Sequence, residues 1–126
     1  MIFGIGTDIV EVARIEEALE RFGDAFAQRI LDAREFEDYR HSGTRARFLA
    51  KRFAAKEAFA KALGTGIRGA TSFINIGIAH DALGKPMFEL APVLREELAT
   101  QGITGQHLSI SDEKNLATAF VVLERG

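Results

Sequence analysis

The pattern of apolar and polar positions is strand-like at both ends of the chain and helical over much of the middle. Residues 2–12 (Ile-Phe-Gly-Ile-Gly-Thr-Asp-Ile-Val-Glu-Val) are β-branched and apolar on both alternating faces, which predicts a strand covered on both sides. Gly4 and Gly6 weaken this strand and indicate either a bulge or a close approach by another backbone.

Helical periodicity follows in stretches that are bounded by capping residues, proline or glycine. The predicted helices are residues 13–22, 34–41, 45–63 and 92–101. Asp32 and Thr44 are expected to cap the second and third helices. Gly64 is expected to end the third helix, and Pro92 opens the fourth. The helix over 45–63 is the longest element that the sequence predicts.

The remaining apolar stretches are short and are separated by polar turns, as in strands that pair with their neighbours. The predicted strands are residues 72–80, 87–90, 107–111 and 116–123. The turn from Asp81 to Pro86 joins the first two of these into a hairpin. The order of elements predicts an α+β fold, with a mainly antiparallel sheet packed on one long helix. At 126 residues we expect one domain, residues 1–126.

Composition excludes several kinds of site and protein. The chain has no cysteine, so it has no disulfide framework, thiolate zinc site or cysteine nucleophile. Its three histidines share no short ligand spacing, and its net charge of −2 argues against a general nucleic-acid binder. No apolar run approaches membrane-spanning length and no signal peptide is recognisable, so a soluble cytoplasmic protein is expected.

Two carboxylates and several basic residues are candidates for chemistry. Asp8 lies in an apolar strand, where a carboxylate must be paired, metal-bound or protonated; an arginine partner or a loop cap is the simpler interpretation. Glu57 and Lys61 lie one turn apart at the edge of the apolar arc of the long helix. They could form a surface ion pair or act as functional groups. Arg52 and Lys56 fall inside that arc, which suggests a subunit interface or an anion site. Two acids beside basic residues suggest a hard-cation site with a phosphate ligand.

Two further motifs allow more than one interpretation. Gly64-Thr65-Gly66 is a helix C-terminal cap that could also let a phosphate come close, but it lacks the context of a P-loop. His107, Ser109 and Ser111 share one face of a strand, which could line a ligand cleft or face solvent. A serine hydrolase is not supported, because no Gly-x-Ser-x-Gly sequence occurs.

Long stretches of the chain resemble a known family. The segment Gly4–Ile15 (GIGTDIVEVARI) resembles the N-terminal signature of the holo-[acyl-carrier-protein] synthase family of 4′-phosphopantetheinyl transferases. The segment Arg52–Ile67 (RFAAKEAFAKALGTGI) resembles the second signature of that family. Gly84-Lys85-Pro86 and His107–Ser111 match weaker family features in the expected order and spacing.

This resemblance implies a phosphopantetheinyl transferase-like fold and a reaction that serves fatty acid biosynthesis. Coenzyme A donates phosphopantetheine to a serine of an apo acyl carrier protein and 3′,5′-ADP is released. Asp8 and Glu57 would hold Mg²⁺, and Lys61 would stabilise charge on the departing 3′,5′-ADP or the transferred phosphoryl group. Lys85 or His107 would be available for the 3′-phosphate. The implied coenzyme-binding residues are Arg52, Gly64, Thr65, Gly66, Lys85, Pro86, His107 and Ser109.

The resemblance also implies a partner and an assembly. Carrier proteins of this kind are acidic, and Arg14, Arg21 and Arg29 form a basic stretch suited to docking them, with Phe26 as an apolar anchor. One departure from the family pattern is Ala25, where a basic residue is common. The small members of the family are expected to form homotrimers that bind the coenzyme between subunits.

Two other classes of function are alternatives to a transferase. A non-catalytic module that binds coenzyme A would keep Lys61, Lys85 and the Gly-Thr-Gly turn but would not need both Asp8 and Glu57. A Mg²⁺-dependent pyrophosphate hydrolase would require a denser set of carboxylates than the chain offers. The presence of both acids therefore favours the transferase.

Overall fold

The computed structural model describes all 126 residues and has an α+β architecture. The strands are β1 (Ile2–Glu11), β2 (Ile76–His80), β3 (Pro86–Leu90), β4 (Ile103–Asp112) and β5 (Leu116–Arg125). The helices are α1 (Val12–Phe22), α2 (Asp24–Ile30), α3 (Ala33–Arg40), α4 (Arg45–Leu63) and α5 (Pro92–Thr100). None of these helices combines the length and hydropathy of a membrane-spanning segment.

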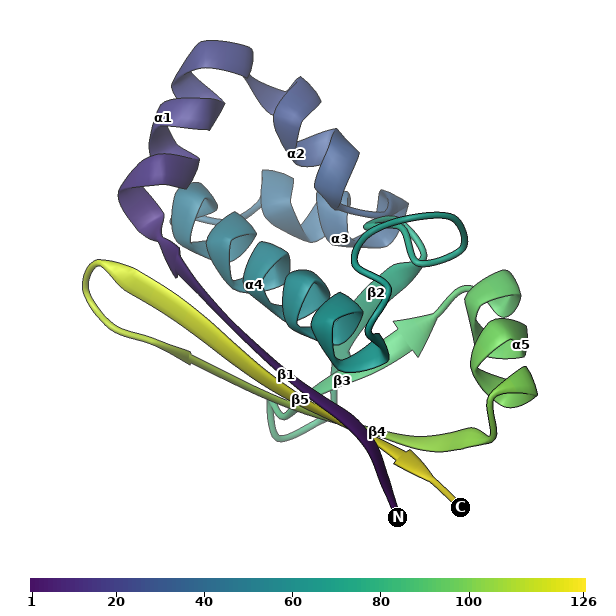
Figure 1. Cartoon of the computed structure of the whole chain (residues 1–126). Coiled ribbons are helices and arrows are strands. Elements are labelled where there is room, and N and C mark those ends of the chain that lie inside the picture. Colours follow the sequence, from purple (N-terminus) through teal and green to yellow (C-terminus); the bar gives the residue numbers. More distant parts are fainter.

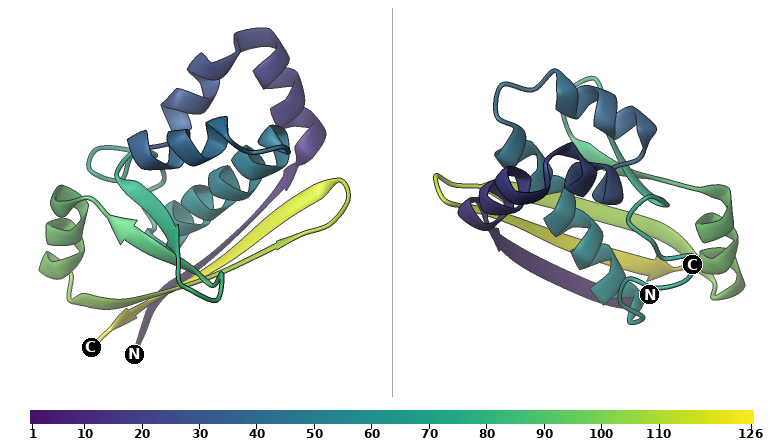
Figure 2. Two further views of the ribbon diagram at one scale, coloured as in Figure 1. Left: turned by 180° about the vertical axis from the view of Figure 1, so that it is seen from behind. Right: turned by 90° about the horizontal axis from the view of Figure 1, so that it is seen from above.

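The long helix α4 lies at the centre, with a sheet on one side and α1 to α3 on the other (Figure 1). That sheet has the strand order β1-β5-β4, and all its pairs are antiparallel. The hairpin of β2 and β3 forms a separate two-stranded sheet, which α5 follows at one end of the molecule (Figure 2). The predicted fold class, a mainly antiparallel sheet packed on one long helix, is confirmed.

Two glycines allow α4 to rest directly on β1. A Cβ atom at Gly4 would lie 2.0 Å from the backbone oxygen of Ala62, and one at Gly6 would lie 2.0 Å from that of Ala58. No side chain fits in such a space, so the close backbone approach indicated by these glycines is confirmed. The facing residues on α4 are two buried alanines, Ala58 and Ala62, which are 0% and 4% exposed.

The outer face of the three-stranded sheet is largely uncovered within one chain. Ile5 and Ile9 on β1 are 59% and 65% exposed, and Phe120 on β5 is 45% exposed. The prediction that the first strand is covered on both sides is therefore wrong for the single chain. The strand is apolar on both faces, but only the face toward α4 is buried by this chain's own residues.

Most predicted element boundaries agree with the structure, but one predicted strand starts later, β4 starts earlier, at Ile103, and helix α2 was not predicted. Asp32 caps α3, and Gly64 ends α4 in the left-handed conformation with φ 90°. Thr44 occupies the N-cap position of α4 but makes no side-chain hydrogen bond there. Residues 72–75 form a turn instead of the start of a strand, because the Ser72 side chain and backbone oxygens accept hydrogen bonds from the backbone of residues 75 and 76.

A buried ionic network on the side of α4 away from β1 was not foreseen. Glu35 of α3 is 1% exposed and accepts hydrogen bonds from Nζ of Lys56 at 2.6 Å and Nη1 of Arg52 at 3.3 Å. Its second oxygen also accepts the backbone N–H of Ile78 at 3.1 Å. Nζ of Lys56 donates two further bonds, to the backbone oxygens of Ile30 and Phe73 at 2.6 and 2.8 Å. Three helices and the β2–β3 region are thereby tied together.

This network corrects the interpretation of Arg52 and Lys56 as marks of a subunit interface or an anion site. Both residues do lie inside the apolar surface of α4, but their anion is Glu35 of the same chain. Burial lowers the pKa of Lys56, and the Glu35 carboxylate acts in the opposite direction. A fully buried ammonium with three acceptors has no capacity left for an external ligand.

We expect Gly6→Ala to lower the free energy of unfolding by about 3 kcal/mol, at the upper end of the cost of overpacking a core. The added methyl group would overlap the backbone of α4, which cannot move aside as a side chain can. Gly43→Ala is the matched control, because a Cβ atom there meets nothing within 4 Å. Urea unfolding at one fixed protein concentration measures both variants, and equal stabilities would contradict the close contact.

We expect Lys56→Met to lower the free energy of unfolding by about 3–5 kcal/mol, because it leaves a buried carboxylate without its ammonium partner. Lys51→Met is the control on the same helix, since the Lys51 side chain is 38% exposed and its nearest carboxylate oxygen is 3.9 Å away. The control should change stability by less than about 0.5 kcal/mol. Similar losses for both variants in chemical denaturation would show that the network is not needed for folding.

Candidate active site

Asp8 and Lys61 meet where α4 crosses β1. Nζ of Lys61 donates to Oδ1 of Asp8 and to the backbone oxygen of Thr7, each at 3.0 Å. Asp8 lies two residues beyond Gly6 on the same face of the strand, so the glycine contact brings its side chain to the helix edge. The Asp8 side chain is 15% exposed and that of Lys61 is 53% exposed. The Asp8 carboxylate is thus largely buried, whereas about half of the Lys61 side chain is exposed to solvent.

This pairing decides between the interpretations offered for these residues. The partner of Asp8 is a lysine, not an arginine, and Asp8 caps no loop. Lys61 forms its ion pair with Asp8 across the strand–helix contact, so a simple surface ion pair between Glu57 and Lys61 is wrong. The lysine and both acids belong to one group of side chains, as the candidate-site hypothesis requires.

Asp8 and Glu57 line one pocket of about 530 Å³. Its polar end holds these two carboxylates, together with Glu11. Its other walls are apolar or basic, and they are formed by Ile9, Val10, Arg14, Ile15, Phe26 and Phe53. The pocket therefore combines an acidic centre with an apolar side next to α1 and α2.

The electrostatics of Glu57 reflect this arrangement. Partial burial and the neighbouring Asp8 carboxylate raise the pKa of Glu57 above its ordinary value, and Lys61 acts in the opposite direction. A cation placed between the two acids would offset the repulsion from Asp8 that raises the pKa of Glu57. The pair is therefore a better cation site than either acid alone.

The residues present fit Mg²⁺ better than a metal that needs a full protein cage. No group of three or more His, Cys, Asp or Glu side chains is arranged to hold a metal ion. Mg²⁺ needs only one or two carboxylates, because substrate phosphates and retained waters fill its other positions. Asp8 and Glu57 supply that number, and both line the same pocket.

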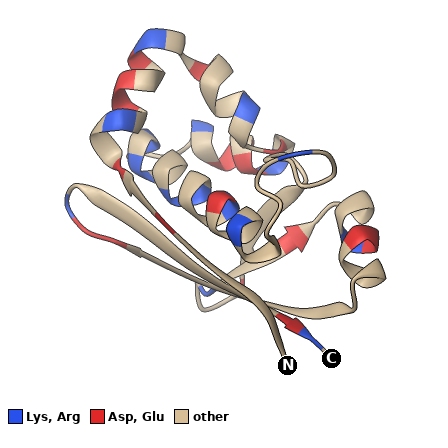
Figure 3. Ribbon diagram, in the orientation of Figure 1, with Lys and Arg blue, Asp and Glu red and all other residues tan.

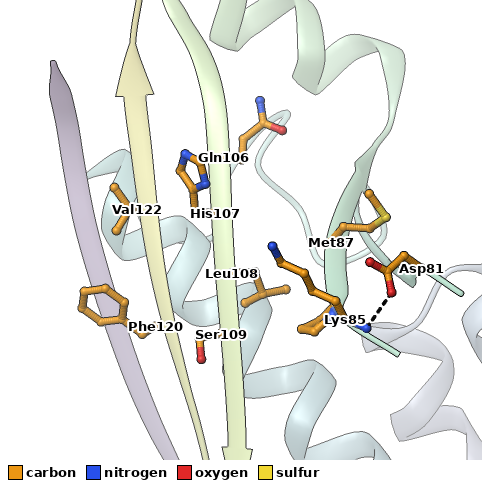
Figure 4. Close-up of a pocket in the computed structure, with 10 residues that line it drawn as sticks. Asp81, Lys85, Met87, Gln106, His107, Leu108, Ser109, Phe120 and Val122 are labelled. Carbon is orange, nitrogen blue, oxygen red and sulfur yellow. Dashed lines mark hydrogen bonds between the residues drawn. The ribbon is translucent and has the colours of Figure 1, made fainter. Parts of the chain in front are cut away.

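A second pocket of about 420 Å³ gathers predicted coenzyme-binding residues at the edge of the sheet (Figure 4). Lys85 and Pro86 enter it from the turn before β3, and His107 and Ser109 from β4. The turn is fixed by Asp81, whose Oδ1 accepts the backbone N–H groups of residues 83 and 85 at 2.9 Å. The sequence-based grouping of these four residues agrees with their position in space.

The two pockets lie at opposite edges of the three-stranded sheet, one at β1 and the other at β4, and share no lining residue. His107 and Ser109 pair with Val122 and Phe120 on the outer face of the sheet, whereas Asp8 lies on the face toward α4. One copy of the chain therefore does not bring the acidic residues and this second set to a single ligand.

Other predicted coenzyme contacts lie elsewhere. Arg52 has a side chain that is 8% exposed, pairs with Glu35 and lies over the ring of Phe48. Gly64 and Thr65 line a third pocket, after the end of α4, and Gly66 follows with φ 71°. The turn is open to solvent, as a phosphate-approaching segment must be, but it is not joined to either of the other two pockets.

The predicted docking residues lie on the two helices beside the acidic pocket. Arg14 and Phe26 line that pocket directly. Arg21 at the end of α1 and Arg29 at the end of α2 are exposed, and neither forms an ion pair within the chain (Figure 3). These positive charges are therefore available to an external partner.

Phe53 also lines the acidic pocket, but the sequence indicated it only as part of the apolar arc of the long helix. Phe53 lies one turn before Glu57 on α4 and stacks on Phe73 with ring centroids 5.5 Å apart. Its spacing from Glu57 is the same as that of Lys61, so the i, i+4 relation that singled out Lys61 could also have singled out Phe53.

Comparison with known proteins places these features in one family. Residues 4–121 match the model of the 4′-phosphopantetheinyl transferase superfamily. Holo-[acyl-carrier-protein] synthase of Nitrosospira multiformis is 57% identical over 125 residues, which covers 99% of this chain and all of that protein. The crystal structure of the synthase from Neisseria meningitidis is 58% identical, with a TM-score of 0.97 over 99% of this chain and all of that one. A Bacillus anthracis synthase in complex with CoA (3′,5′-ADP) is 40% identical, with a TM-score of 0.83, covering 100% of this chain and 99% of that one.

We expect Asp8→Asn to lower the pKa of Glu57 in the metal-free protein, because the substitution removes the neighbouring negative charge. Carboxyl ¹³C NMR of labelled glutamate, followed through a pH titration, measures the shift. Glu11→Gln removes a carboxylate from the same pocket that does not act on Glu57, and it should leave the midpoint in place. An unchanged midpoint in Asp8→Asn would show that the two acids do not interact.

Proposed function

The chain belongs to the holo-[acyl-carrier-protein] synthases of the 4′-phosphopantetheinyl transferase superfamily, and from this we propose that it carries the family's activity in one domain of 126 residues. It moves 4′-phosphopantetheine from coenzyme A to a serine of an apo acyl carrier protein, with Mg²⁺, and releases 3′,5′-ADP. We assign the reaction to fatty acid biosynthesis in the cytoplasm.

The observation that carries this proposal is that Asp8 and Glu57 line one pocket and that Lys61 forms an ion pair with Asp8. The reaction transfers one phosphoryl group, with its pantetheine arm, from a negatively charged diphosphate to a neutral hydroxyl, so its main requirement is control of charge on the phosphates. Two acids and a lysine at a pocket edge meet that requirement, and the synthase of Bacillus anthracis has been seen in complex with CoA (3′,5′-ADP).

In the proposed mechanism, Asp8 and Glu57 would hold Mg²⁺, and the bound ion would supply charge neutralisation and Lewis acidity for the diphosphate. The serine oxygen forms a bond to the phosphorus that carries the pantetheine arm, and the bond from that phosphorus to the bridging oxygen breaks. The serine proton passes to Glu57 or to a water beside it. The electron pair stays with the bridging oxygen of 3′,5′-ADP.

Lys61 is suited to the leaving group. Its Nζ donates to Asp8 and to the oxygen of Thr7, and about half of the side chain is exposed. An ammonium held in advance near a developing negative charge lowers the barrier without having to reorganise. Lys61 would therefore stabilise the bridging oxygen as it departs.

The separation of the two pockets supports a homotrimer with the coenzyme between subunits. Lys85 and His107 lie at the edge of the sheet opposite to Asp8, so a coenzyme that contacts both sets would touch two copies of the chain. The exposed apolar face around Ile5, Ile9 and Phe120 supplies a surface that a second copy could cover.

The basic stretch on α1 and α2 supports the proposed partner. Arg14, Arg21 and Arg29 would attract the acidic surface of the carrier protein, and Phe26 would contact it beside the acidic pocket. This arrangement would deliver the carrier's serine to Asp8 and Glu57 without passing through the coenzyme pocket. The carrier and the coenzyme would thus approach from different sides.

The test is the intact mass of an apo acyl carrier protein incubated with the enzyme, coenzyme A and Mg²⁺. We expect a gain of one phosphopantetheine that EDTA abolishes, because the metal is removed. Asp8→Ala and Glu57→Ala should each slow transfer by about 100-fold or more. Glu96→Gln, an exposed carboxylate on α5, is the charge-matched control and should transfer normally.

The outcomes separate this function from the alternatives. Coenzyme A that binds without any gain in carrier mass would identify a binding module and leave Asp8 as a structural carboxylate. Transfer at normal rates by either alanine variant at saturating Mg²⁺ would remove that acid from the metal site.

A further inference from the structure

An acidic residue that has no role so far contacts the predicted coenzyme ligand His107. Nε2 of His107 on β4 lies 2.5 Å from Oε1 of Glu124 on β5. The two side chains are 60% and 45% exposed, and theirs is the only ion pair that joins two strands of the three-stranded sheet. An ordinary surface pair of this exposure adds little stability, so the contact calls for another explanation.

The strand opposite Glu124 is shaped to leave this contact undisturbed. Gly105 is the register partner of Glu124, and a Cβ atom there would lie 3.3 Å from Oε1 of Glu124 and 3.6 Å from Nε2 of His107. Gly105 does not have a positive φ, so its backbone conformation does not require glycine. A side chain at this position would crowd Oε1 of Glu124, the atom that meets His107.

The contact fixes which ring nitrogen of His107 is left for a ligand. Nε2 is engaged by the Glu124 carboxylate, so Nδ1 is the free nitrogen of a ring that lines the pocket with Lys85 and Ser109. A carboxylate can only accept a hydrogen bond, and therefore the proton of this contact lies on Nε2. A ring that also binds an anion through Nδ1 must donate a hydrogen bond from that nitrogen as well.

We propose that Glu124 is a positioning residue, which holds His107 so that its Nδ1–H donates to the 3′-phosphate of coenzyme A. The proposal rests on the proposed function, since coenzyme A is then the ligand of this pocket. Glu124 itself does not line the pocket, so it acts through His107. Carboxylates that orient the far nitrogen of a ligating histidine act in the same way at metal sites.

The test compares coenzyme A with 3′-dephospho-coenzyme A, which lacks only the phosphate in question, at saturating carrier protein. We expect Glu124→Gln to raise KM for coenzyme A about tenfold with kcat unchanged, the cost of one charge-assisted hydrogen bond. KM for the dephospho substrate should not change. Gly105→Ala, which keeps both side chains and disturbs only their contact, should shift KM in the same direction and with the same substrate dependence.

Glu113→Gln is the matched control, because it removes an exposed carboxylate from the turn at the opposite end of the same β4–β5 hairpin. It should leave both KM values unchanged. If Glu124→Gln raises KM equally for both substrates, or for neither, the positioning role is wrong although the transferase activity stands. If the unmodified enzyme transfers from neither substrate, it is the proposed function that fails.

Discussion

The structure depends first on the direct contact between the backbone of α4 and that of β1. Gly4 and Gly6 present no side chain, and the oxygens of Ala62 and Ala58 occupy the space where a Cβ atom would be. The contact does more than bury a helix. Because the alternation of β1 places Asp8 on the same face as the glycines, the depth of the helix sets the distance between Asp8 and Lys61. Side chains at Gly4 and Gly6 would push α4 away from β1, and Asp8 would then lie farther from Lys61 and Glu57.

The opposite side of α4 is fixed by charge rather than by close packing. Glu35 receives Lys56 and Arg52 from the helix and the backbone N–H of Ile78 from the hairpin. Such a network adds little net stability, but breaking it is costly, so it favours one orientation of the helix over others. Glu57 follows Lys56 directly in the chain. A rotation of the helix that displaced Lys56 would therefore also turn Glu57 away from its pocket.

The sequence predicted the features that are determined by a few neighbouring residues. The glycines of β1, the Asp32 cap and the Gly64 terminus each act over a few residues, and all three appear in the structure. The partner of Lys56 was not predictable in this way, because Glu35 lies 21 residues away in the chain. The exposed face of β1 was misjudged for a related reason. Apolar residues on both faces show that both faces are to be covered, but not that one chain covers both.

The two contacts of α4 place Asp8 and Glu57 so that, in our proposal, they act together on one cation in the presence of the coenzyme. The most direct measurement is binding of Mn²⁺, as a paramagnetic probe, followed by electron paramagnetic resonance with and without coenzyme A. The account predicts that coenzyme A strengthens Mn²⁺ binding and that Asp8→Asn and Glu57→Gln each weaken it by about tenfold or more. Equal Mn²⁺ binding by the unmodified protein and both variants would contradict it.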